Sequence, residues 1–349
     1  MFATGIGSLP IALAQHERGT SPRVAAEIVR DSFPRLPHVV ELPARRAGAD
    51  MIGRTAALLS QISDDFALTT VPTGWRLTSR AGLDMERARQ FLQQDDDALA
   101  EVYADYHGSM KVQICGPLTW SRSVENLSGE PALSDIGFVR DAVRVVPELI
   151  AQLSRRMRSL VPGLTQLIVQ IDEPALLQVI SGGVPTASGY SRVRSISAQQ
   201  VTTWFSDLVQ TTQQADTALW LHNCADEALI DLANVAAFSG TSFDISTITT
   251  ADVDRLGTAF ERGRTLVIGA IGVSDWSLAE GVIASRACER IELLRSRLSI
   301  PQDEWARQVV VTPACGLAGA TPAQARTVMK AASAAAASLT GDTINPASE

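Results

Sequence analysis

The chain has 349 residues, of which 46% are hydrophobic, and it carries a formal net charge of −8. Hydrophobic content at this level allows a large folded core and argues against intrinsic disorder. The acidic charge argues against nucleic acid and anionic membrane surfaces as the main partners, because both attract a basic protein face.

The amino-terminal sequence "MFATGIGSLPIALAQHERG" lacks a basic segment before its apolar residues and is interrupted by glycine and proline, unlike a secretory signal. No apolar run approaches the length that crosses a bilayer. The chain contains only four cysteines, too few for the disulfide framework of a secreted domain. We therefore expect a cytoplasmic protein with reduced thiols, in which clustered Cys and His indicate metal binding or catalysis.

Eight short apolar or β-branched runs, each bounded by turn residues, predict β-strands. They lie at residues 2–8, 38–43, 111–117, 167–174, 218–224, 241–246, 266–272 and 308–316. Their nearly continuous apolar character is typical of strands that are buried on both faces of a parallel sheet.

Stretches with apolar residues three and four positions apart predict helices between most of these strands. The clearest helices cover residues 137–160, 198–213, 280–298 and 322–339. Ser197 and Thr321 precede two of them as expected N-caps, and Pro322 suits a first helical position. Strands that alternate with helices in this way predict a (β/α)8 TIM barrel.

The interval from residue 44 to residue 110 is too long for a single crossover helix. Within it, "FALTTVPTGWRLTS" at 66–79 predicts a small hairpin inserted before the third strand. We expect one catalytic barrel over residues 1–340 and a loose C-terminal tail at 341–349.

Polar and sulfur-containing side chains gather at the carboxyl ends of the predicted strands, which form the active-site face of such a barrel. These side chains are Ser8, Glu41, Cys115, Asp172, Glu173, His222, Cys224, Asp244 and Cys315. Four of them, His222, Cys224, Asp244 and Cys315, can converge on one metal ion. Imidazole, thiolate and carboxylate are zinc ligands, and two sulfurs favour zinc over magnesium or calcium.

Structural interpretations compete with the functional ones at these positions. Buried cysteines often serve as small hydrophobic residues, and this interpretation is favoured for Cys115 and Cys288. The pair formed by His222 and Cys224 can also be structural.

Structural interpretations are also open for the carboxylates and for the residues at the end of the first predicted strand. Asp172 and Glu173 can cap the helix that follows them or pair with an arginine at the barrel mouth. Gly7 and Ser8 can form a tight turn, and Glu41 can have a structural role.

Five motifs resemble the C-terminal catalytic barrel of cobalamin-independent methionine synthase. They are "TGIGSLP", "VQICGPLTW", "IVQIDEPAL", "LHNC" and "TPACGL", and they occur in the order found in that family. The resemblance runs from Thr4 to the final predicted helix and implies a short, core-type member without the long N-terminal half of the full-length enzyme. It also implies a zinc-dependent enzyme that methylates the thiol of homocysteine to form methionine.

The resemblance implies a ligand set for zinc. The family uses a histidine, a cysteine two residues later, an acidic residue on the next strand and a distant cysteine. His222, Cys224 and Cys315 match three of these positions, and Asp244 stands where the family has a glutamate.

The resemblance implies substrate contacts as well. Ser8 matches the serine whose backbone meets the homocysteine carboxylate, and Asp172 matches the aspartate that holds the amino group. Glu41 lies near a second acidic contact to that amino group, and Glu173 belongs to the same motif as Asp172. The candidate catalytic residues are His222, Cys224, Cys315 and Asp172.

The residues that match the methyl-donor site of the full-length family differ from the pattern of that family. The tryptophan that stacks on the pterin in that family comes earlier here, as Trp120, and Ser123 falls near its expected place. Leu177 and Gln178 replace a basic and an acidic residue. These departures favour a methylcorrinoid, a corrinoid protein or another methyl donor over free methyltetrahydrofolate.

Three other functions stay open at this point. The first is zinc-dependent alkyl transfer to another thiol, such as coenzyme M. The second is a barrel without catalysis that binds a corrinoid or a partner protein. The third is a metal-free barrel of the uroporphyrinogen decarboxylase type, which leaves the combination of His222, Cys224 and Cys315 unexplained.

Overall fold

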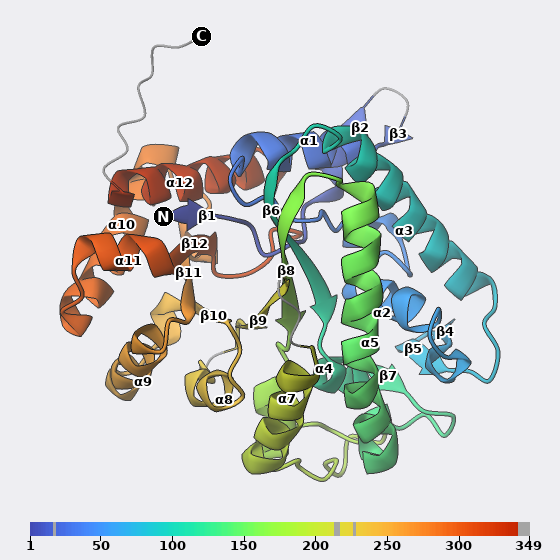
Figure 1. Cartoon of the computed structure of the whole chain (residues 1–349). Coiled ribbons are helices and arrows are strands. Elements are labelled where there is room, and N and C mark those ends of the chain that lie inside the picture. The colour runs from blue at the N-terminus through green and yellow to red at the C-terminus, as the bar shows by residue number, and fades with distance from the viewer. Residues whose placement is uncertain (17–18, 213–216, 226–227, 341–349) are drawn as a thin grey trace.

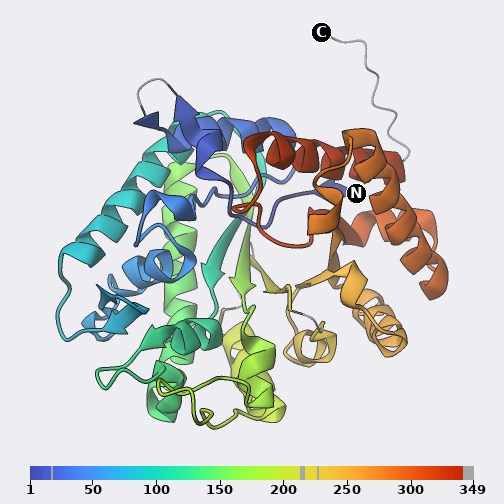
Figure 2. The ribbon, with the colours of Figure 1, turned by 180° about the vertical axis from the view of Figure 1, so that it is seen from behind.

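The computed structural model describes residues 1–16, 19–212, 217–225 and 228–340. Seven parallel strands form one curled sheet, and helices cover its outer side (Figures 1 and 2). Across the sheet, the strands are β1 (Phe2–Ala3), β12 (Val309–Pro313), β11 (Thr265–Ile271), β10 (Gly240–Asp244), β9 (Thr217–Asn223), β8 (Leu164–Asp172) and β6 (Gly108–Cys115). The expected tail at 341–349 lies outside the described residues.

The segment at residues 37–41 connects the two edges of this sheet. The backbone N–H of Val39 donates to the carbonyl of Lys111 at 2.8 Å, and that of Glu41 donates to the carbonyl of Gly7 at 3.1 Å. The segment therefore occupies the second strand position of a (β/α)8 barrel. It forms isolated bridges instead of a regular ladder, so the sheet is not fully closed.

The strand predicted at 38–43 therefore lies at the expected position in the barrel, but its residues do not form the regular hydrogen-bonded ladder of a strand. Pro37 and Pro43 bound the segment. Because proline has no N–H to donate, a regular ladder cannot extend through either end.

Helices connect the strands on the outer side of the sheet. They are α1 (Pro22–Ser32), α2 (Met51–Leu59), α3 (Leu83–Val102), α4 (Pro117–Ser123), α5 (Ile136–Leu160), α6 (Leu176–Ser181), α7 (Ala198–Thr212), α8 (Ile230–Val235), α9 (Thr250–Glu261), α10 (Glu280–Leu298), α11 (Gln302–Gln308) and α12 (Pro322–Thr340). The four clearest predicted helices correspond to α5, α7, α10 and α12. No helix in the ranges that the structure describes is long and apolar enough to cross a membrane.

Both predicted N-caps are confirmed. Ser197 Oγ accepts a hydrogen bond from the backbone N–H of Gln200 at 3.2 Å. Thr321 Oγ1 accepts one from the N–H of Gln324 at 3.3 Å. Each bond satisfies a backbone donor that has no partner within the first turn of the helix.

The predicted insertion before the third barrel strand is also confirmed. Strands β4 (Leu68–Val71) and β5 (Gly74–Leu77) form an antiparallel hairpin, and β7 (Val124–Glu125) adds to it in parallel. A second small ribbon pairs β2 (Gln15–His16) with β3 (Gly19–Thr20). Single 3-10 turns complete the chain at η1 (Ile11–Ala14), η2 (Pro43–Arg45), η3 (Asp64–Phe66), η4 (Ala132–Ser134), η5 (Ile245–Thr247) and η6 (Val273–Asp275).

A small apolar cluster is separate from the main core, which lies between the sheet and the helices. It consists of Leu36, Ile168, Trp220, Val267 and Val310. Ile168 and Trp220 lie two residues before Gln170 and His222, and therefore point to the same face of their strands. Apolar side chains thus precede the polar ones on this face, and the polar ones lie toward the carboxyl ends.

Candidate active site

Strand register brings three candidate side chains into one row at the carboxyl ends of the strands. Asp172 of β8 pairs with His222 of β9, and His222 pairs with Ser242 of β10. Residues paired in a parallel sheet point to the same face. An acid, an imidazole and a hydroxyl therefore lie side by side.

The imidazole of His222 is held in one orientation. Its Nδ1 lies 2.9 Å from Ser242 Oγ, and the ring is buried. A hydrogen bond at Nδ1 fixes the ring and leaves Nε2 for a second partner. Sequence reasoning missed Ser242, because its contact depends on the register between β9 and β10.

Two cysteines from distant segments meet beside this ring. Cys315 Sγ lies 3.5 Å from Cys224 Sγ. Hydrogen bonding with Cys224 and with His222 lowers the pKa of Cys315. The hydrogen bond to Cys315 raises the pKa of Cys224, with burial adding to the effect. The two thiols therefore titrate as a coupled pair.

The donor chemistry of these three side chains fits zinc. Tetrahedral zinc with Zn–S bonds of about 2.3 Å separates two thiolate sulfurs by about 3.8 Å, close to the 3.5 Å found here. The hydroxyl at Nδ1 of His222 is the kind of outer contact that orients a metal-binding imidazole. Among the residues that the structure describes, no group of three or more His, Cys, Asp or Glu side chains is arranged to hold a metal ion.

Asp244, the expected fourth zinc ligand, has a local contact instead. Its Oδ1 accepts hydrogen bonds from the backbone N–H and the hydroxyl of Ser246, at 2.8 and 2.7 Å. The carboxylate thereby caps η5. Ser242, and not Asp244, is the residue of β10 that contacts His222.

The carboxylate of Asp172 faces the same site. Burial raises its pKa, while its electrostatic interactions with His222 and Lys111 lower it and that with Cys315 raises it. The negative charge of Asp172 in turn raises the pKa of Cys224. These mutual effects indicate that the carboxylate and the thiol pair line one site.

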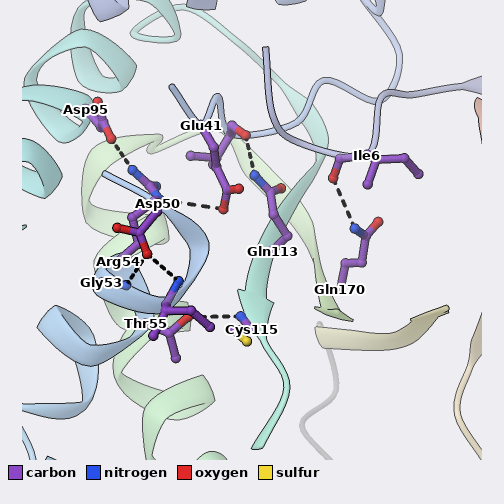
Figure 3. A network of polar contacts seen from close by, with 12 residues as sticks. Ile6, Glu41, Asp50, Gly53, Arg54, Thr55, Asp95, Gln113, Cys115 and Gln170 are labelled. Carbon is purple, nitrogen blue, oxygen red and sulfur yellow. Dashed lines mark hydrogen bonds and ion pairs between the residues drawn. The ribbon is translucent and has the colours of Figure 1, made fainter. Parts of the chain in front are cut away.

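Glu41 is the second buried carboxylate of the site. Burial raises its pKa to about 7, the nearby Arg54 lowers it, and the charge of Asp172 raises it further. Arg54 Nε lies 3.5 Å from Glu41 Oε1. Figure 3 shows Arg54 between Glu41 and Asp95, and it forms ion pairs with both.

Glu173, by contrast, has its carboxylate fully engaged inside the protein. Its two oxygens accept hydrogen bonds from the backbone N–H groups of Leu118 and Thr119, at 2.9 and 2.7 Å, and from the Thr119 hydroxyl at 2.6 Å. The side chain has no exposed surface, and burial raises its pKa to about 7. This geometry matches the helix-capping interpretation, although the helix is α4 rather than the one that follows.

Ser8, which follows the first strand, contacts the loop that follows the last strand of the sheet. Its carbonyl accepts a hydrogen bond from the N–H of Leu317 at 2.8 Å. A Cβ on Gly316 would collide with Ser8 Oγ unless the Ser8 side chain rotated away, so the two segments approach closely here. Ser8 therefore lies next to the loop that carries Cys315.

The other two cysteines have packing environments. Burial raises the pKa of Cys115 well above its usual value, so it stays a neutral thiol. Cys288 lies on α10, with its Sγ 3.7 Å from the carbonyl of Ala335 on α12. The structural interpretation of both residues agrees with this geometry.

These features define a parallel α/β barrel with thiols, an imidazole and carboxylates at the carboxyl ends of its strands. The family model described as "Cobalamin-independent synthase, Catalytic domain" matches residues 98–338, and the chain belongs to this family of methionine synthase-like methyltransferases. The resemblance noted in the sequence motifs is thereby confirmed. No curated protein matches the chain.

Two solved structures share the fold. A B12-independent methionine synthase from Shewanella sp. W3-18-1, in complex with selenomethionine, has a TM-score of 0.60 and 11% identity, over 97% of this chain and 98% of that one. A methyltransferase from Methanosarcina mazei has a TM-score of 0.57 and 14% identity, over 95% of this chain and 92% of that one. At these identities the similarity concerns the fold.

Proposed function

We propose that this chain is a zinc-dependent methyltransferase that moves a methyl group to the thiol of homocysteine and forms methionine. The observation that carries the proposal is the close pair of Cys224 and Cys315 thiols beside the oriented ring of His222. Membership of the methionine synthase-like family supports methyl transfer as the reaction.

We propose that His222, Cys224 and Cys315 hold the zinc. Asp244 is the proposed fourth ligand, and it would first have to leave its contacts with Ser246. A free thiol has a pKa near 8.5 and is mostly protonated at neutral pH. Zinc, when bound, supplies a positive charge that lowers the pKa of an incoming thiol.

The remaining residues bind and orient the amino-acid part of homocysteine. Asp172 and Glu41 are buried carboxylates that would receive its ammonium group. The backbone at Ser8, beside the Cys315 loop, would meet its carboxylate. These contacts would direct the substrate thiol toward the cysteine pair. For Glu173 we propose an indirect role, which is to hold α4 in place.

Transfer replaces the S–H bond of homocysteine by an S–CH3 bond, and it releases one proton and the demethylated donor. Asp172 and Glu41 would act before this step, because an anchored ammonium leaves the thiol few orientations. Confining the reacting atoms in this way is a large source of rate acceleration.

The proposed methyl donor is a methylcorrinoid, free or on a carrier protein. The ring of Trp120 supports this choice, because it is 1% exposed and stacks on Phe138 with centroids 6.0 Å apart. Its Nε1 donates to the carbonyl of Ile52 at 3.3 Å. A ring engaged in this way does not offer its face to a pterin.

The test is methionine formation by the zinc-loaded protein, with methylcobalamin or methyltetrahydrofolate as donor. Homocysteine and coenzyme M are compared as acceptors. We expect about one zinc per chain, and methionine formed from homocysteine with methylcobalamin. Absence of bound zinc after reconstitution under reducing conditions, or methylation of coenzyme M alone, would overturn the proposal.

A further inference from the structure

A lysine is buried inside the barrel, below the candidate site. Lys111 of β6 has no exposed surface. Its ammonium group donates to the carbonyl of Ile6 and to Gln170 Oε1, both at 2.8 Å. Burial lowers the pKa of Lys111 to about 8, while the charges of Asp172 and Glu41 oppose that shift. The lysine is therefore mostly cationic at neutral pH.

The contact with Lys111 fixes the orientation of the Gln170 amide. An ammonium group can only donate, so it must face the carbonyl oxygen of the amide. The amide nitrogen then points the other way, where it donates to Asp172 Oδ1 at 2.7 Å. Flipping the amide would place its N–H groups against the ammonium and its oxygen against the carboxylate.

The same two side chains also hold the segment that follows β1. Gln170 Nε2 donates to the carbonyl of Ile6 at 3.0 Å, as Figure 3 shows, and Lys111 donates to that carbonyl too. Ile6 lies two residues before Ser8. One buried pair of side chains thus fixes both the backbone that leads to Ser8 and one oxygen of Asp172.

We propose that Lys111 is a positioning residue for amino-acid recognition, which acts through Gln170 to hold Asp172 Oδ1 and leave the second carboxylate oxygen for the ligand ammonium. This inference rests on the proposed function, because it assumes a ligand with an α-amino group. It adds that recognition of the ammonium depends on two side chains that do not touch the ligand.

Calorimetry of the zinc-loaded protein tests the proposal with two probes. Methionine carries the α-amino group, and 4-(methylthio)butanoate is the same molecule without it. The wild type is expected to bind methionine more tightly. Lys111→Met should reduce this preference by about 10- to 100-fold, the effect of a charge-assisted hydrogen bond. Binding of 4-(methylthio)butanoate should change little.

A second variant and a control separate positioning from stability. Gln170→Glu keeps an acceptor for Lys111 but cannot donate to Asp172, so it should also lose the preference, and it decides the matter if Lys111→Met does not fold. Leu153→Ala, in the buried face of α5, should lower the melting temperature and keep the preference.

The outcomes distinguish this inference from the proposed function. A wild type that does not bind methionine overturns the proposed function, and the role of Lys111 with it. A wild type that prefers methionine, together with folded variants that keep the full preference, overturns the role of Lys111 alone.

Discussion

The sulfur of Cys315 lies 3.5 Å from the sulfur of Cys224, although the two residues are 91 positions apart in the sequence. One thiol follows the end of β9, and the other lies in the loop after β12. Because the pair forms only when both segments are in place, it reports directly on the integrity of the candidate metal site.

Replacing Cys315 by serine should abolish zinc retention. The variant keeps a side chain of similar size but removes one of the two thiolates that favour zinc. Elemental analysis should find about one zinc per wild-type chain and little in the variant. Cys288→Ser is the matched control, because that thiol packs between α10 and α12. Full zinc occupancy in Cys315→Ser would exclude the proposed site.

Replacing Ser242 by alanine should weaken zinc binding without abolishing it. The change removes the contact at His222 Nδ1, and loss of such an outer contact typically reduces metal affinity by about 10- to 100-fold. Competition with a chelator measures the affinity. Ser239→Ala, which removes a hydroxyl that donates to the carbonyl of Leu219, should leave it unchanged. Equal affinities in both variants would show that Ser242 does not orient the ring.

Asp244→Asn tests the fourth zinc ligand. Asparagine caps a helical turn as well as aspartate does, so the contacts with Ser246 should survive and the fold should not change. If the carboxylate joins the zinc, affinity should fall by about tenfold or more. Unchanged affinity, measured by the same chelator competition, would assign Asp244 to its local cap only.

Methionine binding should tighten as the pH rises through about 7. Burial raises the pKa of Glu41 to about 7, so the group is neutral below that pH and can attract an ammonium only above it. Calorimetry between about pH 6 and pH 8 measures the effect, and Glu41→Gln should flatten it. A wild-type profile as flat as that of Glu41→Gln would exclude this carboxylate as a contact.

The raised pKa of Glu41 also makes the stability of the folded protein depend on pH. The folded protein holds the proton of Glu41 more tightly than the unfolded chain, whose pKa is about 4.3. Stability from this group is therefore full below about pH 4.3, and it falls as the pH rises toward 7.

Glu173→Ala should destabilise the protein by about 1–3 kcal/mol, because it leaves two buried N–H groups at the start of α4 without a partner. Urea unfolding measures the loss. Glu173→Gln keeps an acceptor oxygen and should lose less. If Glu173→Gln instead abolished methionine binding with its stability intact, Glu173 would contact the ligand directly.

The sequence predicted most of the fold because the pattern is local. Apolar residues three and four positions apart mark α5 and α12, and Ser197 and Thr321 mark the starts of α7 and α12 through single contacts three residues away. The sequence predicted a regular strand at 38–43, where the structure has only isolated bridges. The apolar residues correctly indicated burial, but they do not show whether a segment bounded by prolines can form a ladder.

The candidate site was predicted less completely, because its supporting contacts join different strands. Ser242 reaches His222 only through the register of β9 and β10. The sequence did mark Lys111 and Gln170 as unusual, since both are polar residues inside apolar strands. Their partners, however, depend on how β6 and β8 lie beside the segment that follows β1.

The contact between Ser8 and the Gly316 loop has a consequence for biosynthesis. Ser8 is translated before Gly316, because it precedes Gly316 in the sequence. The two segments that meet at this contact are thus far apart in the sequence. The contact between the Ser8 carbonyl and the Leu317 N–H can therefore form only after both segments have been translated.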